Sequence, residues 1–155
     1  MRISHKVDYG VRAVAAIARA ERSNPGVSVK REAVGDAEAI PPSFFPDILR
    51  ALRLGGVLRS TRGPEGGWNL ARPAEQITVA DVIRALEGPL ASVRGIRPHE
   101  LPDHGGVEPF TSLWVAVRVS LRSVLDGVTI AELAEGDLPD HVQELLRTPG
   151  AWTAI

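Results

Sequence analysis

The stretch from Ser28 to Pro73 constrains the fold of this chain more than any other part of the sequence. Its residue pattern predicts a helix, a turn, a second helix and a short β-hairpin, in that order. The hairpin spans Gly56 to Pro73 and has apolar residues in both strands around the glycine-rich turn RGPEGG. Any small α+β domain can contain a helix followed by such a hairpin, but the full run of elements is typical of a winged helix-turn-helix domain.

The second helix of this stretch is predicted to have one buried face and one outward face. Apolar residues at helical spacing are expected on the buried face: Ile48, Leu49, Leu52 and Leu54. Polar residues are expected to point outward: Ser43, Asp47, Arg50 and Arg53. Proline is tolerated only in the first turn of a helix, so Pro46 predicts either a helix with Ser43 as its N-cap or a kink at Pro46. A recognition helix needs this division of faces.

The composition excludes several other classes of protein. With 155 residues, 24% charged and 44% apolar, the chain is expected to fold as one domain or as a small domain with a dimerisation extension. No apolar run approaches the roughly 18 residues that span a bilayer, and residues 1–10 lack the apolar centre of a signal peptide. We therefore expect a cytoplasmic protein with no membrane partner. The lack of cysteine excludes disulfides, thiolate zinc sites, cysteine-ligated iron–sulfur clusters and cysteine nucleophiles.

The formal net charge of −1 hides an uneven distribution between the two halves of the chain. Residues 1–73 carry 12 Lys and Arg against 7 Asp and Glu, a net charge of +5, whereas residues 74–155 carry 6 against 12, a net charge of −6. The positive half contains the helix-turn-helix candidate, as expected of a surface that contacts DNA phosphates. A charge of +5 is also compatible with an ordinary protein surface.

Capping and turn signals predict the elements outside the central stretch. A helix is expected from Ser4, as N-cap, to about Ala20, and another from Lys30 to about Gly35. The patterns Thr78-x-x-Asp81 and Thr129-x-x-Glu132 predict capping boxes at two further short helices. Between them, a loop rich in glycine and proline precedes a long helix that begins at Pro109.

The predicted fold is therefore mainly α with a small β-hairpin wing, of the α+β class. Its expected parts are a winged helix-turn-helix DNA-binding domain at 1–90 and an irregular loop at 91–108 that is a possible effector region. A dimerisation helix with a following short helix is expected at 109–135, and a poorly determined tail at 136–155.

The long helix carries an apolar seam that predicts a homodimer. The seam consists of Leu113, Trp114, Val117, Leu121 and Val124, and a second apolar line with Val115 and Val119 is expected to widen it. One protomer rarely needs so much apolar surface on a C-terminal helix, so we expect the seam to contact a second copy of the chain. The alternative is that this helix packs back onto its own domain.

The segment from Arg59 to Val93, RSTRGPEGGWNLARPAEQITVADVIRALEGPLASV, closely resembles the IscR/NsrR-type (Rrf-two) family of winged-helix transcription regulators. The opening MRISHKVDYGVRAV and the later TSLW before the long helix resemble it as well, so the likeness runs from Met1 to about Glu135. The resemblance implies a homodimer whose recognition helix enters the major groove and whose wing arginine enters the minor groove. The residues implied at the DNA are Ser43, Phe44, Pro46, Asp47, Arg50, Arg59, Arg62, Gly63 and Gly67.

Sensor members of that family hold an iron–sulfur cluster with three cysteines in the loop before the long helix, and here the matching positions, near Gly95 and Glu108, are not cysteine. Asp8 matches a position that supplies a carboxylate ligand in some members, but a surface salt bridge is the better interpretation. The polar loop residues His99, Glu100, Asp103, His104 and Glu108 could form a site for a hard or borderline metal ion, but their spacing is loose and matches no zinc pattern, so a solvated polar loop is the better interpretation. We expect a regulator with no metal and no cofactor, whose input is an unknown small molecule or protein.

No nucleophile–base arrangement and no nucleotide-binding motif occurs in the sequence, so we do not expect an enzyme. The sequence favours a homodimeric regulator that binds double-stranded DNA and acts as a repressor. The alternative is a winged-helix protein-interaction module without DNA binding.

Overall fold

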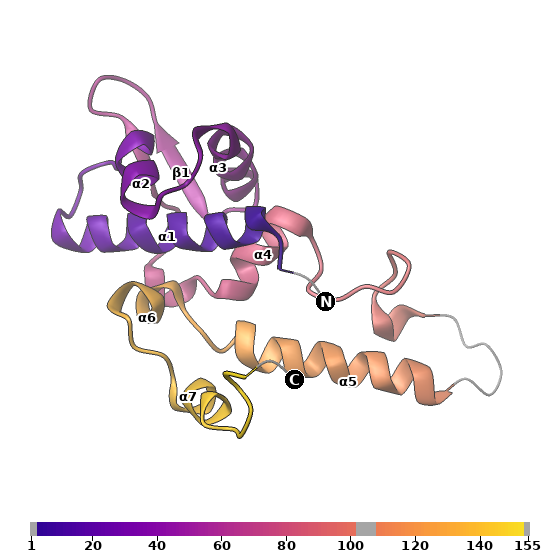
Figure 1. The fold of residues 1–155 in the computed structure, drawn as a ribbon. Helices are drawn as coiled ribbons and strands as arrows, with labels where there is room; N and C mark the ends of the chain where they lie inside the picture. The colour runs from indigo at the N-terminus through magenta and orange to yellow at the C-terminus, as the bar shows by residue number, and fades with distance from the viewer. Residues whose placement is uncertain (1–2, 102–107, 154–155) are drawn as a thin grey trace.

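The computed structural model describes residues 3–101 and 108–153. Within them the protein is mainly helical with one two-stranded antiparallel hairpin, as the sequence predicts (Figure 1). Its helices are α1 (His5–Ser23), α2 (Arg31–Glu38), α3 (Phe45–Leu54), α4 (Val79–Glu87), α5 (Glu108–Leu125), α6 (Ile130–Glu135) and α7 (Asp140–Leu146). Three short 3-10 turns are η1 (Pro42–Phe44), η2 (Ala74–Gln76) and η3 (Pro98–Glu100), and the strands are β1 (Leu58–Thr61) and β2 (Gly67–Leu70).

Helix α1 is the centre of the fold, with α2, α4, α6 and β2 packed around it (Figure 1). The hydroxyl of Ser4 accepts a hydrogen bond from the Val7 N–H, which confirms the predicted N-cap. The helix continues three residues beyond the predicted end. Val14 and Ile17 are fully buried in its middle, so the apolar face predicted from the sequence supports the core.

The turn before α3 differs from the prediction. Ser43 is not an N-cap: it lies in η1, and α3 begins after Phe44 with no side-chain cap. Pro46 lies in the first turn of α3, where its missing N–H costs no helical hydrogen bond, so the 3-10 turn replaces both the expected cap and the expected kink. The interpretation of Leu54 was also wrong, because its side chain is 72% exposed at the end of the helix.

The hairpin forms a small wing that is joined to the start of α2. Leu58 pairs with Leu70 and Thr61 with Gly67 in its antiparallel register. Beyond β2, the backbone of Val29 exchanges two hydrogen bonds with Trp68, with N···O distances of 2.9 and 2.8 Å. The segment before α2 therefore acts as a third short strand and fixes the wing relative to the helix-turn-helix.

Both predicted capping boxes are present, at Thr78 and at Thr129. The two threonines also form an antiparallel bridge, with the Ile130 N–H donating to the Ile77 carbonyl at 2.8 Å. This bridge places α6 against α1 and connects the C-terminal part of the chain to the core.

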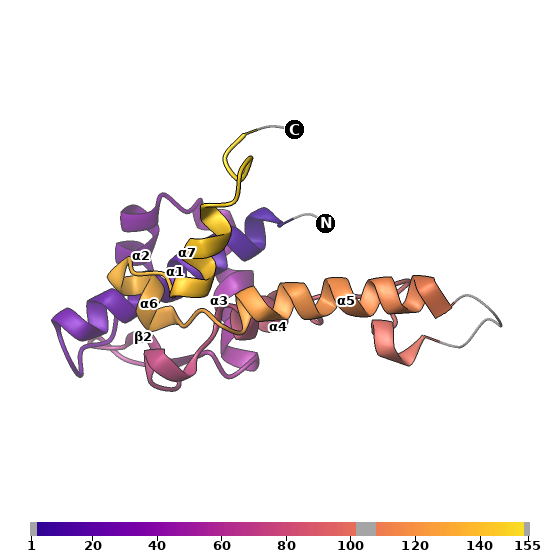
Figure 2. The same cartoon turned by 90° about the horizontal axis from the view of Figure 1, so that it is seen from below.

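Helix α5 projects from this core, and the loop after α4 runs beside it (Figure 2). Over its described residues, 91–101, the loop has no regular element apart from η3 and a bridge between Val93 and Ile96. The region expected to be a tail instead contains α7, which buries Val142. No helix among the described residues is long and apolar enough to cross a membrane.

Candidate nucleic-acid interface

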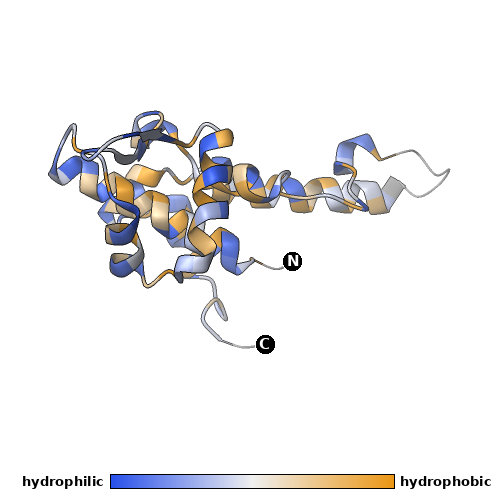
Figure 3. Cartoon of the chain, turned by 90° about the horizontal axis from the view of Figure 1, so that it is seen from above, coloured by the Kyte–Doolittle hydropathy of each residue, from blue (hydrophilic) through white to orange (hydrophobic). Residues whose placement is uncertain are grey.

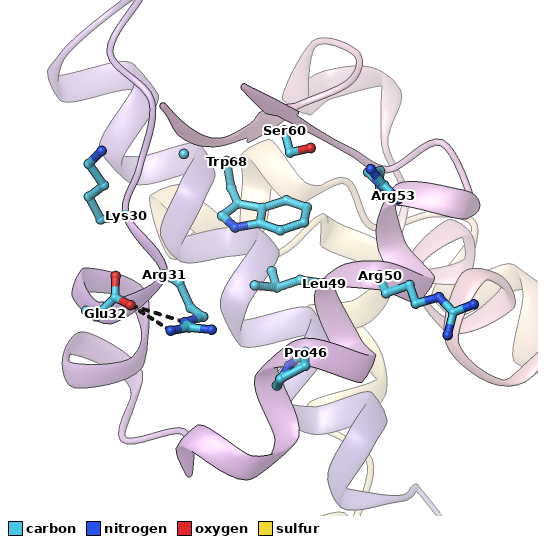
Figure 4. Close-up of a pocket in the computed structure, with 10 residues that line it drawn as sticks. Lys30, Arg31, Glu32, Pro46, Leu49, Arg50, Arg53, Ser60 and Trp68 are labelled. Carbon is cyan, nitrogen blue, oxygen red and sulfur yellow. Dashed lines mark hydrogen bonds and ion pairs between the residues drawn. The ribbon is translucent and has the colours of Figure 1, made fainter. Parts of the chain in front are cut away.

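A hollow of about 520 Å³ lies between the start of α2, the outward side of α3 and the wing (Figure 4). Four basic residues line it: Lys30, Arg31, Arg50 and Arg53. Glu32 is the acidic residue among the lining side chains, and Trp68, Leu49 and Pro46 supply apolar floor and walls. We call this region the basic surface. Its concave shape and positive charge suit a phosphate backbone.

Helix α3 presents its polar face toward solvent beside the basic surface. Asp47, Arg50 and Arg53 are exposed, as predicted, while Ile48 and Leu52 on the opposite face are buried. Figure 4 shows Arg50 extending away from the helix and Arg53 lying toward Ser60 of the wing. The guanidinium groups of Arg50 and Arg53 therefore point away from a helix whose opposite face is buried in the core.

Six of the nine predicted DNA-contacting residues do not line the basic surface: Ser43, Phe44, Asp47, Arg59, Arg62 and Gly63. Ser43, Phe44 and Asp47 line a separate hollow of about 270 Å³ on the side of α3 that faces Lys6. Phe44 also packs edge-on against Tyr9 of α1, with ring centroids 5.1 Å apart. This contact gives Phe44 a role in attaching η1 to α1.

The wing carries an exposed arginine, Arg62, at its tip. Gly63, next to it, has a φ of 104°, which side-chain-bearing residues rarely adopt. Gly67 is required for an intramolecular reason, because an added Cβ would lie 2.6 Å from the Val29 carbonyl oxygen. Arg59 is exposed, and its Nε donates to the Leu70 carbonyl at 3.1 Å, which couples β1 to β2.

Several residues of the basic surface escaped the sequence analysis as site residues, namely Lys30, Arg31, Ser60 and Trp68. The Lys30 ammonium donates to the carbonyls of Pro64 and Gly66 and so connects α2 to the wing loop. A basic pair at the start of a helix, followed by an aromatic strand residue, is the sequence signal that could have pointed to them.

Glu32 offsets part of the positive charge of the basic surface. Its own backbone N–H and the Arg31 guanidinium, 2.9 Å from its carboxylate, lower the pKa of Glu32 below its ordinary value. The carboxylate is therefore ionised at neutral pH and orients Arg31 along the surface (Figure 4).

Helix α5 contains many hydrophobic residues along its length (Figure 3), and those that are exposed form a second candidate interface. Four of them share one helical face and define what we call the apolar seam: Phe110, Leu113, Trp114 and Val117. Leu121 and Val124 continue this face, but they are half-buried in a groove of the same protomer lined by Val7 and Ile83. Val119 does not widen the seam, because nine residues at about 100° each place it almost opposite Phe110.

The chain offers no thiolate for an iron–sulfur cluster, and the residues that the structure describes do not fit another iron site. The chain has no cysteine, and no group of three or more His, Asp or Glu within the described ranges could hold a metal ion. Asp8 is 55% exposed and pairs with Arg12 at 3.3 Å, which agrees with the salt-bridge interpretation. Asp103 and His104 lie outside the described residues, as does the side chain of Glu108.

Comparisons with known proteins add independent information. Residues 3–136 match the model of the Rrf2 family, described as iron-dependent transcriptional regulators. The Mycobacterium tuberculosis (strain H37Rv) protein Rv1287, provisionally named an HTH-type transcriptional regulator, is 47% identical over 145 residues, which cover 94% of this chain and 88% of that protein. The HTH-type transcriptional regulator CymR of Bacillus subtilis (strain 168) is 29% identical over 134 residues, 86% of this chain and 90% of CymR.

Solved structures of similar proteins share the fold. The structure of CymR, titled the global cysteine regulator of B. subtilis, superposes with a TM-score of 0.71 at 26% identity and covers 88% of this chain and 98% of CymR. The structure of T. potens IscR gives a TM-score of 0.68 at 28% identity, with 88% of each chain covered. These likenesses confirm the predicted winged helix-turn-helix fold.

Proposed function

Since the chain belongs to the Rrf2 family of transcriptional regulators, we propose that it binds duplex DNA in a sequence-specific manner as a homodimer and represses transcription. The chain is a regulator and not an enzyme. The observation that carries the proposal is the basic surface, where two arginines of α3 and the wing face the same side of the molecule.

Helix α3 is proposed to enter the major groove. Its core-facing residues are buried and its polar residues are exposed, so it can approach base edges without disturbing the fold. Asp47 lies in its first turn, where a carboxylate can accept a hydrogen bond from a cytosine amino group. Arg50 and Arg53 are proposed to contact phosphates and bases beside it, with Ser43 and Pro46 near the leading end.

The wing is proposed to place Arg62 in the minor groove. A long cation at the tip of a narrow hairpin suits the negative potential of a narrow minor groove. The open space around Gly63 leaves room for the DNA backbone to approach the tip. Gly67 and Arg59 support this role indirectly, because both shape the hairpin that carries Arg62.

The apolar seam of α5 is proposed to join two copies of the chain. Four large apolar side chains exposed on one face of a projecting helix are costly in water and are covered when two such helices pack. A two-fold dimer presents its recognition helices to successive major grooves, so we expect half-sites about 34 Å apart or a multiple of that distance.

Repression is the simplest regulatory mode for such a dimer. A bound dimer covers promoter DNA, so it can exclude polymerase without any further contact. Fusing the selected operator to a reporter promoter tests this mode: expression is expected to fall when the protein is present, and a rise would indicate an activator.

The dependence of duplex binding on salt tests DNA recognition itself. If Arg50, Arg53 and Arg62 of each protomer neutralise phosphates, about six counterion sites are displaced, and log affinity is expected to fall with log salt with a slope of about −5. The operator is first selected from genomic fragments with the purified protein. A protein with no affinity for any duplex would instead be the interaction module considered above.

The lack of cysteine ligands for an iron–sulfur cluster leads to a second expectation. We expect the purified protein to be colourless, and its DNA affinity to be insensitive to nitric oxide, because the chain offers no thiolate ligand. A brown, iron-containing preparation would contradict this part of the proposal.

A further inference from the structure

Arginine side chains surround a cavity of about 440 Å³ between α4, the loop that follows it and α5. Arg84 comes from α4, Arg97 from the loop, and Arg118 and Arg122 from α5. Residues 74–155 contain six basic residues in all, so four of the six line this one cavity in a half whose net charge is −6. Their grouping is not explained by the basic surface, with which the cavity shares no lining residue.

A carboxylate holds two of these guanidinium groups in place. Asp126 accepts hydrogen bonds from Arg84 Nη2 and from Arg122 Nε, both at 2.7 Å. Burial raises the pKa of Asp126, but the hydrogen bonds and the positive charges of Arg122 and Arg84 together outweigh it and lower the pKa below its ordinary value. The two arginines are therefore oriented by an ionised partner that does not itself line the cavity.

The rest of the lining suits an organic anion. Arg97 lies 3.5 Å from Glu100, a loose pair that leaves its guanidinium available to a second acceptor. Pro89 and Leu90 provide an apolar wall, and no acidic side chain is among the described lining residues. The volume lies within the range of about 300–1,000 Å³ that is usual for small-molecule sites.

We propose that this arginine cavity binds a small organic anion carrying at least two phosphate or carboxylate groups. Guanidinium groups bind both kinds of oxyanion in a bidentate manner. Three of the four also pair with Asp81, Asp126 or Glu100, but each guanidinium has five N–H donors, so together they can still bind more than one anionic group. The cavity is lined by residues of both α4, in the DNA-binding domain, and α5, so an anion bound to both helices would change the angle between them. That regulatory consequence rests on the proposed function, whereas binding of the anion does not.

Titration calorimetry without DNA tests the site, with inorganic pyrophosphate and citrate as the phosphate and carboxylate probes. Ionic strength is held constant with sodium chloride. We expect saturable binding of at least one probe with one site per protomer, and the tighter probe identifies the preferred group. If neither probe gives saturable heat, the proposal is wrong.

Matched variants locate the site. The double variant Arg97→Gln with Arg118→Gln is expected to weaken probe binding at least tenfold, while circular dichroism shows unchanged helix content. Arg94→Gln is the control, because Arg94 is an exposed arginine of the same loop that does not line the cavity. Equal binding by the double variant and the parent would overturn the assignment, and so would a change in dimerisation of the double variant with no change in probe binding.

Operator binding with and without the tighter probe tests regulation separately. We expect the probe to shift the operator affinity of the parent and of Arg94→Gln at least threefold, and to leave that of the double variant unchanged. A protein that binds the probe but no duplex would contradict the proposed function and leave the anion site standing. A protein that binds DNA but neither probe would do the reverse.

Discussion

Replacing Leu113 by alanine should weaken the dimer by an amount that the structure allows us to calculate. Leu113 is 51% exposed in the protomer, so contact with a second copy would cover about half of its surface. Burying a whole leucine side chain contributes about 1.5–3 kcal/mol, which makes the half exposed here worth about 1 kcal/mol. A two-fold interface contains the residue twice, so the loss is about 2 kcal/mol, or about 30-fold in the dimer dissociation constant.

Val119→Ala is the matched control. Val119 is 56% exposed on the same helix, but it lies on nearly the opposite face from the apolar seam. Its truncation removes a similar exposed apolar area and should leave the dimer dissociation constant unchanged. Leu121 would be a poorer position, because it is half-buried against its own protomer and a charge there would also destabilise the fold.

Sedimentation equilibrium over a wide range of protein concentrations measures the dimer dissociation constant of each protein. The expected order is an equal constant for the parent and Val119→Ala, with a constant about 30-fold higher for Leu113→Ala. Equal weakening by both variants, or a parent protein that remains monomeric at all concentrations, would refute the role of the apolar seam.

Three further predictions concern the wing, the recognition helix and the ion pair behind the arginine cavity. Arg62→Ala is expected to reduce the operator affinity of the dimer about 100-fold, because each protomer loses a charged contact worth about 1.5 kcal/mol. Asp47→Ala is instead expected to relax the preference at one base pair by about 1–3 kcal/mol. Titration against single-base operator variants separates the two effects, and parent-like binding by Arg62→Ala would show that the wing does not contact DNA. Gly67→Ala is expected to displace the wing, because the new Cβ would lie 2.6 Å from the Val29 carbonyl oxygen. The loosened pairing should appear as faster amide hydrogen exchange in the hairpin while the rest of the core stays protected, and unchanged exchange in the hairpin would contradict this prediction. Asp126 has a folded-state pKa below its ordinary value of 3.8, so its ion pairs stabilise the fold above that pH, and this contribution is lost as the pH falls through the folded pKa. Asp126→Asn should therefore lower the free energy of unfolding in urea by about 1 kcal/mol at pH 7 and by progressively less below pH 3.8. A constant difference across this pH range would show that the charge is not responsible.

Features specified by neighbouring residues could be predicted from the sequence. Thr78 with Asp81, and Thr129 with Glu132, form the capping boxes that their spacing predicts. The wing was also recognisable, because its turn chemistry and alternating strands lie within one short stretch. In each case the interactions that decide the conformation are local, so tertiary packing does not override them.

Helix boundaries and faces were less predictable. The phase of α3 had to be guessed without knowing that η1 precedes it, and Leu54 was placed in the core although it lies at the exposed end of the helix. The assignment of Val119 to the seam failed for the related reason that apolar character was counted without its angular position. Helix α7 was missed because seven residues between proline and glycine signals give little periodicity.

The residues of the basic surface and those of the arginine cavity come from distant parts of the chain, and only the fold brings them together. Lys30 and Trp68 meet because the segment before α2 pairs with β2. Arg84 and Arg122 meet because α5 returns past α4, with Asp126 between them. A single sequence shows that such residues are basic or aromatic, but it does not show that they share a surface.

The hydrogen bonds from Lys30 to the wing loop lower the entropic cost that the loop would otherwise have on binding DNA. A hairpin loop that is free in solution loses conformational entropy when DNA orders it, at roughly 1–2 kcal/mol per residue fixed. Here the Lys30 ammonium already restrains the carbonyls of Pro64 and Gly66 in the unbound protein. This part of the ordering therefore takes place during folding, so a wing that contacts DNA as proposed would meet the duplex in a partly pre-organised shape.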